Sequence, residues 1–266
     1  MSEGNGPILL VGCGRMGGAM LAGWRESGRF VAVVEPKAEV PERSSLVAAV
    51  ADPAHLPSSF APAAVVLAVK PQEAAAVLPA YARYAGSAVF LSIMAGRRIA
   101  GIAASLGGAR VVRAMPNTPA AVRRGITVAC PGPGVTPAER ALCDALLAAI
   151  GRVAWVEDEA LLDPVTAVSG GGPAYVFLLA ELLEEAAAAE GIPRPLARLL
   201  ARETVAGSGA LLAASAEDAA ALRRNVTSPG GTTAEALAVL MAEDAWPLAV
   251  RRAIAAATAR SRALAG

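Results

Sequence analysis

Histidine is the scarcest chemically versatile residue in this chain, and its scarcity excludes several kinds of catalytic site. The 266 residues include a single histidine, His55, in the loop-like stretch ADPAHLPSS. One histidine cannot form a two-histidine metal site or an HExxH zinc helix. A lone loop histidine is typical of an exposed surface position and not of a Ser-His-Asp triad.

Lysine and cysteine are almost as rare. Only Lys37 and Lys70 are present, so the C-terminal half cannot use a Schiff-base or acid–base lysine. Cys13, Cys130 and Cys143 form no CxxC motif and suit neither a zinc site nor a disulfide framework. We interpret them as small buried hydrophobic residues in a reducing compartment and expect no metal. An enzyme built from these residues takes its chemistry from a cofactor.

The composition indicates a folded protein without an excess of either charge. Hydrophobic residues make up 55% and charged residues 18%, and the net charge is +1. This balance argues against general nucleic-acid binding, which needs a basic face. The uncharged stretch 164–180 is interrupted by Gly170, Gly171, Gly172 and Pro173, so we expect no membrane span. No signal-peptide pattern opens the chain, so we expect a cytoplasmic protein.

Short apolar runs alternate with helical patterns over the first part of the chain. This alternation predicts an α/β fold with an open, mostly parallel sheet and helices on both faces. The expected strands are 7–11, 30–34, 64–69 and 88–94, with 111–114 and 126–129 as further candidates, and the expected helices are one that ends near Gly28, 72–84 and 137–150.

After about residue 156 only helices are expected. They cover residues 175–190, 195–214, 232–241 and 248–264 and are rich in alanine and arginine. We therefore divide the chain into domains at 1–157 and 158–266. The apolar helices of the second part are suited to burying an interface between two copies of the chain.

A glycine loop follows the first apolar run. Gly12, Gly14 and Gly17 form a GxGxxG pattern between an expected strand and an expected helix, the context in which the pattern binds a dinucleotide. Gly12 would make the tight turn, Gly14 would let the backbone approach a pyrophosphate, and Gly17 would let helix and strand pack closely. The alternative is a plain tight turn.

Glu35 ends the second expected strand, where an acidic residue typically binds the adenosine ribose hydroxyls. Its negative charge repels a 2′-phosphate and therefore favours NADH slightly over NADPH. Lys37 and Arg15 are close enough in sequence to reach a 2′-phosphate, so the cofactor choice stays open between the two.

Two further motifs end expected strands, the edge of an open α/β sheet where ligands bind. Val69-Lys70-Pro71 places a lysine there, and Arg113–Pro119 adds a proline-stiffened loop that contains Asn117. We expect Lys70 to serve the cofactor or substrate and Asn117 to lie on the nicotinamide side. The alternatives are a surface lysine and an ordinary turn.

Two glycine-rich segments mark the helical half. In Ser228–Glu235, Thr232 and Glu235 fit a capping box, and the Pro-Gly-Gly before the helix leaves backbone N–H groups suited to a carboxylate. Ser169–Tyr175 predicts a similar glycine loop with Pro173 in the first turn of a helix. A plain helix cap is the alternative for both.

Together these residues resemble the pyrroline-5-carboxylate reductase family. The matching segments are GCGRMGGAM, LAVKP, RAMPNTPAAVRRGIT, DPVTAVSGGGPAYVF and NVTSPGGTT, in the family's order, over residues 8 to about 240. The resemblance implies a Rossmann-like doubly wound sheet followed by an all-helical dimerisation domain. It also implies hydride transfer from NAD(P)H to the C=N carbon of 1-pyrroline-5-carboxylate, giving L-proline, in a homodimer often assembled into a decamer of five dimers.

The resemblance also implies roles for individual residues. Thr233 would hydrogen-bond the ring nitrogen of the substrate, and the backbone of residues 230–232 would hold its carboxylate. The other substrate-lining residues would be Glu159, Ser228, Gly230, Gly231 and Thr232. The cofactor residues would be Gly12, Gly14, Met16, Gly17, Glu35, Val69, Lys70, Pro71, Met94, Ala95, Gly96, Asn117 and Asn225.

Two positions depart from the family's usual pattern. Gly171 stands where the family often has serine, which removes one hydroxyl contact. Glu35 stands where the family often has a small polar residue, which puts a preference for NADPH in doubt.

Three other functions remain open. A β-hydroxyacid dehydrogenase shares the two-domain plan but uses a lysine in its helical domain, which this chain lacks. A reductase of another cyclic imino acid would keep the same site. A non-catalytic nucleotide-binding homologue would keep the fold alone. Turnover with a panel of cyclic imines separates these functions.

Overall fold

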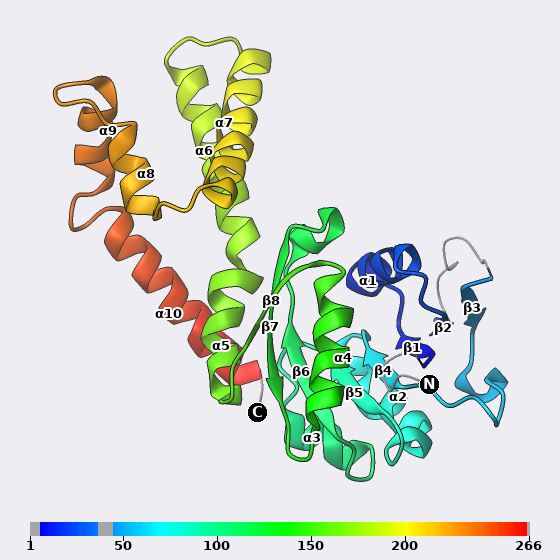
Figure 1. Cartoon of the computed structure of the whole chain (residues 1–266). Coiled ribbons are helices and arrows are strands. Elements are labelled where there is room, and N and C mark those ends of the chain that lie inside the picture. The colour runs from blue at the N-terminus through cyan, green and yellow to red at the C-terminus, as the bar shows by residue number, and fades with distance from the viewer. Residues whose placement is uncertain (1–5, 37–44, 265–266) are drawn as a thin grey trace. The chain divides into compact units, whose positions relative to one another are not determined.

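The computed structural model describes residues 6–36 and 45–264, so Lys37 lies outside the described part (Figure 1). The chain forms two compact units. One contains the residues up to Gly170 together with those from Ala257 onward, and the other contains Gly171–Ala256. The domain boundary predicted at 157/158 follows the change in sequence pattern, whereas the two compact units of the structure divide after Gly170.

An eight-stranded sheet forms the centre of the first unit. Its spatial order is β3-β2-β1-β4-β5-β6-β7-β8, and every neighbouring pair is parallel except β6 and β7. The strands are β1 (Ile8–Val11), β2 (Val31–Val34), β3 (Val47–Val50), β4 (Ala64–Leu67), β5 (Val89–Ser92), β6 (Val111–Met115), β7 (Gly125–Pro131) and β8 (Gly151–Trp155). The predicted open, mostly parallel sheet is confirmed.

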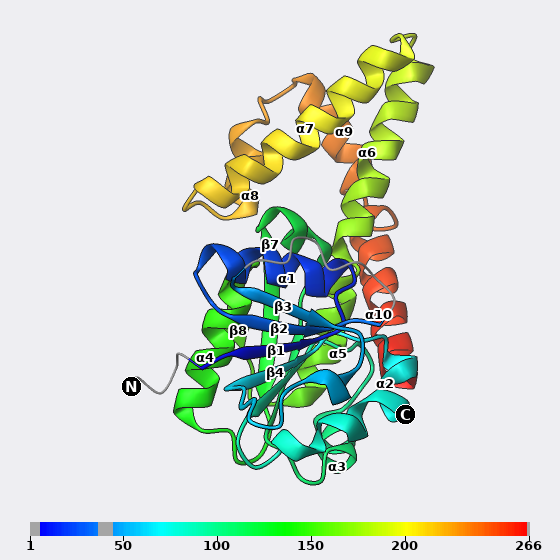
Figure 2. The same ribbon diagram turned by 90° about the vertical axis from the view of Figure 1, so that its right-hand side faces the viewer.

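Helices cover both faces of this sheet (Figure 2). On one face, α1 (Arg15–Glu26) and α4 (Pro137–Ala148) pack against alternate strand residues. On the other face lie α2 (Ala74–Val77), α3 (Ile99–Ser105) and α5 (Leu162–Val165). Because both faces are covered, strands such as β1 and β4 are buried at every residue and read as continuous apolar runs.

Several predicted elements differ in detail. The segment predicted as one helix over 72–84 contains only one α-helical turn, α2, between 3-10 segments at Pro71–Glu73 and Leu78–Tyr84. Pro79 lacks the N–H that an α-helix needs for its hydrogen bond to the preceding turn, which explains the change of helix type. Strands β3 and β8 and the short helices α3 and α8 (Ala219–Asn225) were not predicted.

The second unit is helical. It contains α6 (Gly172–Ala189), α7 (Arg194–Ala214), α8, α9 (Thr232–Leu240) and the first part of α10 (Trp246–Leu264). Helices α6 and α7 lie side by side (Figure 1). No residue of α6 is buried, and large apolar side chains stay exposed on it, for example Phe177 at 66% and Leu178 at 51%. Within one chain these helices therefore leave much of their apolar surface uncovered.

The expectation that glycines break the stretch 164–180 is wrong. A π-helical segment, Thr166–Gly170, joins α5 almost directly to α6, and Gly171 also has right-handed helical backbone angles. By length and composition, Glu159–Ala189 is a helical segment apolar enough to cross a membrane, a test that core helices of soluble proteins also pass. Pro173 lies in the first turn of α6 as predicted, where its missing N–H breaks no hydrogen bond.

Candidate functional site

The glycine loop joins β1 to α1 in a conformation that only small residues permit. Gly12 has a φ of +90°, and a Cβ there would lie 2.8 Å from the Ala68 carbonyl oxygen. A Cβ on Gly17 would lie 2.4 Å from the Gly12 carbonyl oxygen, whereas a Cβ on Gly14 would meet nothing within 4 Å. The first and third glycines therefore allow close packing, and the second leaves open space above the loop.

The N-terminus of α1 points its backbone donors at this open space. Gly14 is the N-cap and no side chain caps the helix. The N–H groups of the first helical residues, Arg15, Met16 and Gly17, have no intrahelical acceptor because they precede the first full turn. Free donors at the positive end of a helix dipole form an anion site, which suits a pyrophosphate.

A cavity of about 790 Å³ lies beyond the carboxyl ends of β1, β2 and β4. Its walls include Gly12, Gly14, Glu35, Val69 and Lys70. In the sheet order β1 stands between β2 and β4, so the strand order reverses at this point. Open α/β sheets bind ligands at such a switch point, and the volume is in the range of small-molecule sites.

Glu35 borders the cavity and contacts the glycine loop. The Cys13 N–H donates to Glu35 Oε2 at 2.9 Å, so the carboxylate is fixed beside the loop. Cys13 is only partly buried, contrary to the expectation of a buried residue, and burial together with the charge of Glu35 raises the pKa of its thiol. Cys130 and Cys143 are buried as expected.

The loop between β5 and α3 carries the next group of predicted cofactor residues. Met94 is 1% exposed and packs in the hydrophobic core, and its N–H donates to the Ser92 hydroxyl at 3.3 Å. Ala95 is exposed. Gly96 has a φ of +66°, and a Cβ there would lie 3.2 Å from the Leu264 carbonyl oxygen. Arg97 donates to the Pro71 carbonyl oxygen at 2.7 and 3.0 Å and so joins this loop to the Lys70-Pro71 segment.

Asn117 braces its own loop. Its Oδ1 accepts a hydrogen bond from the Ile126 N–H at 2.9 Å, and the residue is only 9% exposed. The side chain therefore holds the start of β7 against the end of β6. A contact of Asn117 with the cofactor remains a prediction, and its amide donors are the atoms left to make it.

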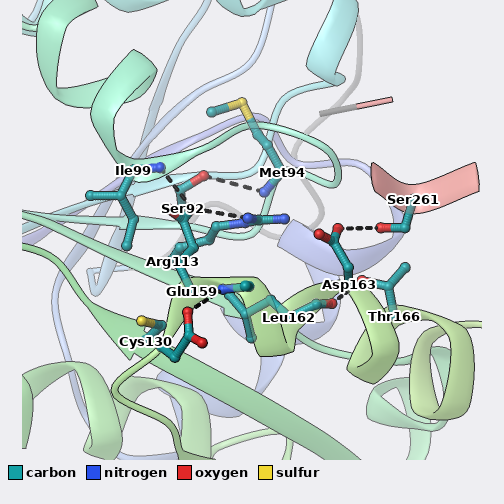
Figure 3. A network of polar contacts seen from close by, with 12 residues as sticks. Ser92, Met94, Ile99, Arg113, Cys130, Glu159, Leu162, Asp163, Thr166 and Ser261 are labelled. Carbon is teal, nitrogen blue, oxygen red and sulfur yellow. Dashed lines mark hydrogen bonds and ion pairs between the residues drawn. The ribbon is translucent and has the colours of Figure 1, made fainter. Parts of the chain in front are cut away.

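A polar network that the sequence did not reveal lies between β6, α3 and the segment before α5 (Figure 3). Arg113, 2% exposed, donates to Glu159 Oε1 at 2.9 Å, and the Ile99 N–H donates to the same oxygen at 2.8 Å. Nearby, Ser261 donates to the buried carboxylate of Asp163 at 2.7 Å. An arginine inside the apolar strand VVRAM was the available signal, because a buried charge requires a partner.

The predicted substrate loop lies in the helical unit. The Gly231 N–H donates to the Ser228 carbonyl oxygen at 3.0 Å, and Gly230 has a φ of +67°. The predicted capping box of Thr232 and Glu235 is wrong, because Gly231 is the N-cap of α9 and no side chain caps this helix. Thr232 is instead the first helical residue, which leaves its hydroxyl and that of Thr233 exposed on the first turn.

The other two predicted features of the helical half are the Ser169–Tyr175 segment and Asn225. The predicted glycine loop at Ser169–Tyr175 is wrong, because the π-helical segment and α6 occupy it. Ser169 and Thr166 donate to the carbonyl oxygens of Val165 and Leu162, which stabilises the widened turn. Asn225 donates to Glu217 at 3.0 Å, and its contact with the cofactor stays a prediction.

The described residues show no cluster of three His, Cys, Asp or Glu side chains placed to hold a metal ion. His55 is exposed at the end of a short 3-10 segment, as predicted.

A doubly wound sheet with an uncapped glycine loop at its switch point is the architecture of a dinucleotide-binding protein, and comparison with known proteins gives the family. Residues 159–264 match the family model for pyrroline-5-carboxylate reductase dimerisation, and residues 7–96 match the one for coenzyme F420-dependent NADP oxidoreductases. The pyrroline-5-carboxylate reductase of Mycobacterium tuberculosis is 38% identical over 294 aligned positions, which cover 99% of this chain and 98% of the relative. The chain therefore belongs to the pyrroline-5-carboxylate reductase family.

Solved structures agree with this assignment. The pyrroline-5-carboxylate reductase of Coxiella burnetii superimposes with a TM-score of 0.91 at 30% identity, covering 98% of this chain and 99% of that one. The Plasmodium falciparum enzyme, solved with NADP bound, has a TM-score of 0.82 at 27% identity, and 99% of each chain is covered. The predicted family, fold class and NAD(P)H-dependent oxidoreductase class are confirmed.

Proposed function

We propose that this chain reduces 1-pyrroline-5-carboxylate to L-proline with NAD(P)H, the last step of proline synthesis. The observation that carries the proposal is the near full-length similarity to the reductase of M. tuberculosis. This similarity spans the glycine loop as well as the Ser228–Thr233 loop, so it is not limited to the nucleotide-binding fold.

The sheet unit fits the cofactor. The uncapped N-terminus of α1 and the open space above Gly14 suit a pyrophosphate, and the cavity beside Glu35 suits an adenosine. When bound, the reduced nicotinamide supplies the hydride that the C=N carbon accepts. The residues proposed to hold the cofactor are Gly12, Gly14, Met16, Gly17, Glu35, Val69, Lys70, Pro71, Met94, Ala95, Gly96, Asn117 and Asn225.

The loop before α9 is proposed to bind the substrate. Its backbone at residues 230–232 would hold the carboxylate, because the first N–H groups of a helix have no intrahelical acceptor. Thr233 would place its hydroxyl against the ring nitrogen, with Ser228 and Thr232 beside it. Glu159 is the remaining proposed substrate residue, and its Oε1 is already occupied by Arg113 and Ile99.

The proposed chemistry needs orientation more than activation. A protonated imine is electrophilic without further polarisation, so no histidine or C-terminal lysine is required. Holding two reactants in a productive geometry can lower a barrier by about 7–11 kcal/mol. In this proposal Thr233 and the backbone N–H groups orient the imine, and no side chain is an obligatory general acid.

We further propose that the chain forms a cytoplasmic homodimer and that five of these dimers assemble into a decamer. The exposed apolar side chains of α6 and α7 support the dimer, because a monomer would leave them in water. The match of residues 159–264 to a dimerisation family model supports it as well. Neither nucleic acid nor a membrane is a proposed partner.

The test is the loss of reduced-nicotinamide absorbance with 1-pyrroline-5-carboxylate, run in parallel with NADH and NADPH. Turnover with either cofactor supports the proposal, and the ratio of kcat/KM values gives the preference. A folded protein that binds cofactor but gives no turnover would contradict it. A panel of other cyclic imines then distinguishes a reductase of a different imino acid from a non-catalytic nucleotide-binding protein.

A further inference from the structure

The β5–α3 loop, residues 93–98, leaves the carboxyl edge of the sheet, where open α/β folds bind their ligands. Its start and its end are held differently. At its start, the Met94 N–H donates to the Ser92 hydroxyl at 3.3 Å. At its end, the Ile99 N–H donates at 2.8 Å to Glu159, a residue 60 positions away in the sequence. The end of the loop therefore depends on where the Glu159 side chain lies.

Arg113 binds that side chain. The guanidinium Nη1 lies 2.9 Å from Glu159 Oε1, the same oxygen that accepts from Ile99 (Figure 3). Arg113 is 2% exposed, whereas the Glu159 side chain is 27% exposed. A carboxylate at a partly wet position can adopt several rotamers, and a rigid buried cation fixes one of them.

The fold alone does not account for an arginine at this position. Its side chain lies on the sheet face that also carries Val111 and Met115, in a hydrophobic cluster. In the described part of the chain, its Nε and Nη2 atoms are buried without any hydrogen-bond partner. Buried donors left unpaired destabilise a fold, and an apolar side chain of similar length would avoid that cost. The charge of Arg113 is therefore best explained by what it does to Glu159.

We infer that Arg113 is a positioning residue for cofactor binding. It acts through Glu159 and the Ile99 N–H to fix the Met94–Gly96 loop. This inference rests on the proposed function, because it takes that loop to contact NAD(P)H. The bound cofactor gains from a loop that is already ordered, so loss of the anchor weakens binding and leaves the hydride-transfer step itself largely unchanged.

The Ile99 N–H can be removed without removing a helical hydrogen bond. Ile99 is the first residue of α3, and Arg98 before it has extended backbone angles of −76° and 150°. Proline is tolerated at this helix position and after an extended residue, so Ile99→Pro deletes the donor and preserves the backbone. Ile99→Ala is the matched control, because it shortens the same buried side chain and keeps the N–H.

The readout is the dissociation constant of NADH, measured by its fluorescence without substrate, with NADPH measured alongside. We expect Ile99→Pro to bind cofactor about 10-fold more weakly than Ile99→Ala, the loss expected for one hydrogen bond to a charged group. When Arg113→Met is added to Ile99→Ala, cofactor binding should weaken by a similar factor of about 10. When it is added to Ile99→Pro, binding should weaken little further, because the hydrogen bond is already lost. Equal dissociation constants for Ile99→Pro and Ile99→Ala would overturn the inference. So would a double variant, Arg113→Met with Ile99→Pro, whose loss of affinity equals the product of the two separate losses.

A second pair of variants covers the case in which Arg113→Met alone fails to fold. Arg113→Met with Glu159→Gln removes both charges and keeps an oxygen acceptor for Ile99, so its cofactor affinity should stay near that of the unmodified protein. Arg113→Met with Glu159→Leu removes the acceptor and should bind about 10-fold more weakly. Equal affinity of these two variants would also refute the positioning role.

Kinetics separate this role from a merely structural one and from failure of the proposed function. In the Ile99→Pro protein, compared with Ile99→Ala, loss of the anchor should raise the KM for cofactor while kcat at saturating cofactor changes little. A variant that only loses stability would instead show a lower Tm with unchanged constants for the folded fraction. An unmodified protein that binds NADH but does not reduce 1-pyrroline-5-carboxylate contradicts the proposed function, whereas the binding comparison above still decides the role of Arg113.

Discussion

At the scale of single residues, the proposed chemistry depends on one hydroxyl group. Thr233 lies on the first, uncapped turn of α9 with its side chain exposed, so its hydroxyl is available to a ligand. Thr233→Val keeps the shape of the side chain and removes the hydroxyl. We expect kcat/KM for the imine to fall about 10- to 100-fold, as for a lost hydrogen bond to a charged group.

The control for this substitution is Thr233→Ser, which restores the hydroxyl and should recover most of the activity. Fluorescence titration should show unchanged NADH binding in both variants. Unchanged turnover of Thr233→Val would mean that Thr233 does not orient the ring nitrogen.

Glu35 carries the prediction about cofactor choice. Its carboxylate is held beside the cavity by the Cys13 N–H, where a 2′-phosphate would meet its negative charge. Glu35→Gln keeps an acceptor for that N–H and removes the charge, and Glu35→Ser shortens the side chain as well. Both variants should raise the ratio of kcat/KM for NADPH to that for NADH. The expected rise is about 10-fold, because removing a repulsion of about 1.4 kcal/mol between the Glu35 carboxylate and the 2′-phosphate corresponds to that factor.

The comparison of the two variants isolates charge from size. A ratio that is the same in the unmodified protein and in both variants would refute the proposed role of Glu35. The residues from 37 to 44 that follow it lie outside the described part, so a counteracting contribution from Lys37 would be revealed by Lys37→Ala in the Glu35→Ser background.

At the scale of elements, the strand–loop–helix unit around the glycines shows which predictions depend on local sequence. Gly28 terminates α1 as predicted, with a φ of +73° and its N–H donating to the Arg25 carbonyl oxygen. The capping box predicted at Thr232 fails because helix α9 begins one residue earlier, with Gly231 as its N-cap. A true capping box occurs at Thr136 and Glu139 at the start of α4. The same sequence pattern therefore caps one helix and not another, because the loop before each helix sets its first residue.

Gly17 and Gly18, two neighbouring glycines of α1, provide matched substitutions that test the packing of this helix against the glycine loop. A Cβ on Gly17 would lie 2.4 Å from the Gly12 carbonyl oxygen. Beyond the adjacent backbone of its own helix, a Cβ on Gly18 would meet only the Cys13 carbonyl oxygen within 4 Å, at 3.8 Å. Gly17→Ala should displace the helix from the loop and weaken NADH binding at least about 10-fold, since small shifts of a binding element are costly.

Gly18→Ala should leave binding unchanged and stabilise the fold by about 0.5–1 kcal/mol, the usual gain for alanine over glycine inside a helix. Cofactor titration and thermal melting measure the two effects. Equal affinity of the Gly17→Ala and Gly18→Ala proteins would show that close packing of helix and loop is not needed for binding.

At the scale of the whole molecule, the helical unit leaves apolar side chains exposed. Phe177, Leu178 and Leu182 on α6 are at least 50% exposed. We predict that Leu182→Asp weakens self-association about a hundredfold or more, because burial of a leucine contributes about 1.5–3 kcal/mol and a two-fold interface carries each change twice. Analytical ultracentrifugation measures the dissociation.

Glu185→Gln on the same helix is the control and should leave the assembly intact. The sheet unit of Leu182→Asp should still bind NADH, since the glycine loop and cavity lie within that unit. An unchanged sedimentation coefficient for Leu182→Asp would mean that this part of α6 is not in the subunit interface.

Local sequence by itself determined the glycine loop, most strands of the sheet, the end of α1 and the family, because each depends on residues close together in the chain. Tertiary structure decided the rest. The contacts of Arg113 with Glu159 and of Asp163 with Ser261 join residues 46 and 98 positions apart, and no local pattern encodes such pairs. The π-helical segment before α6 likewise overrode the tendency of three glycines and a proline to form a loop. Long-range packing fixes these features, since only the folded chain brings their partners together.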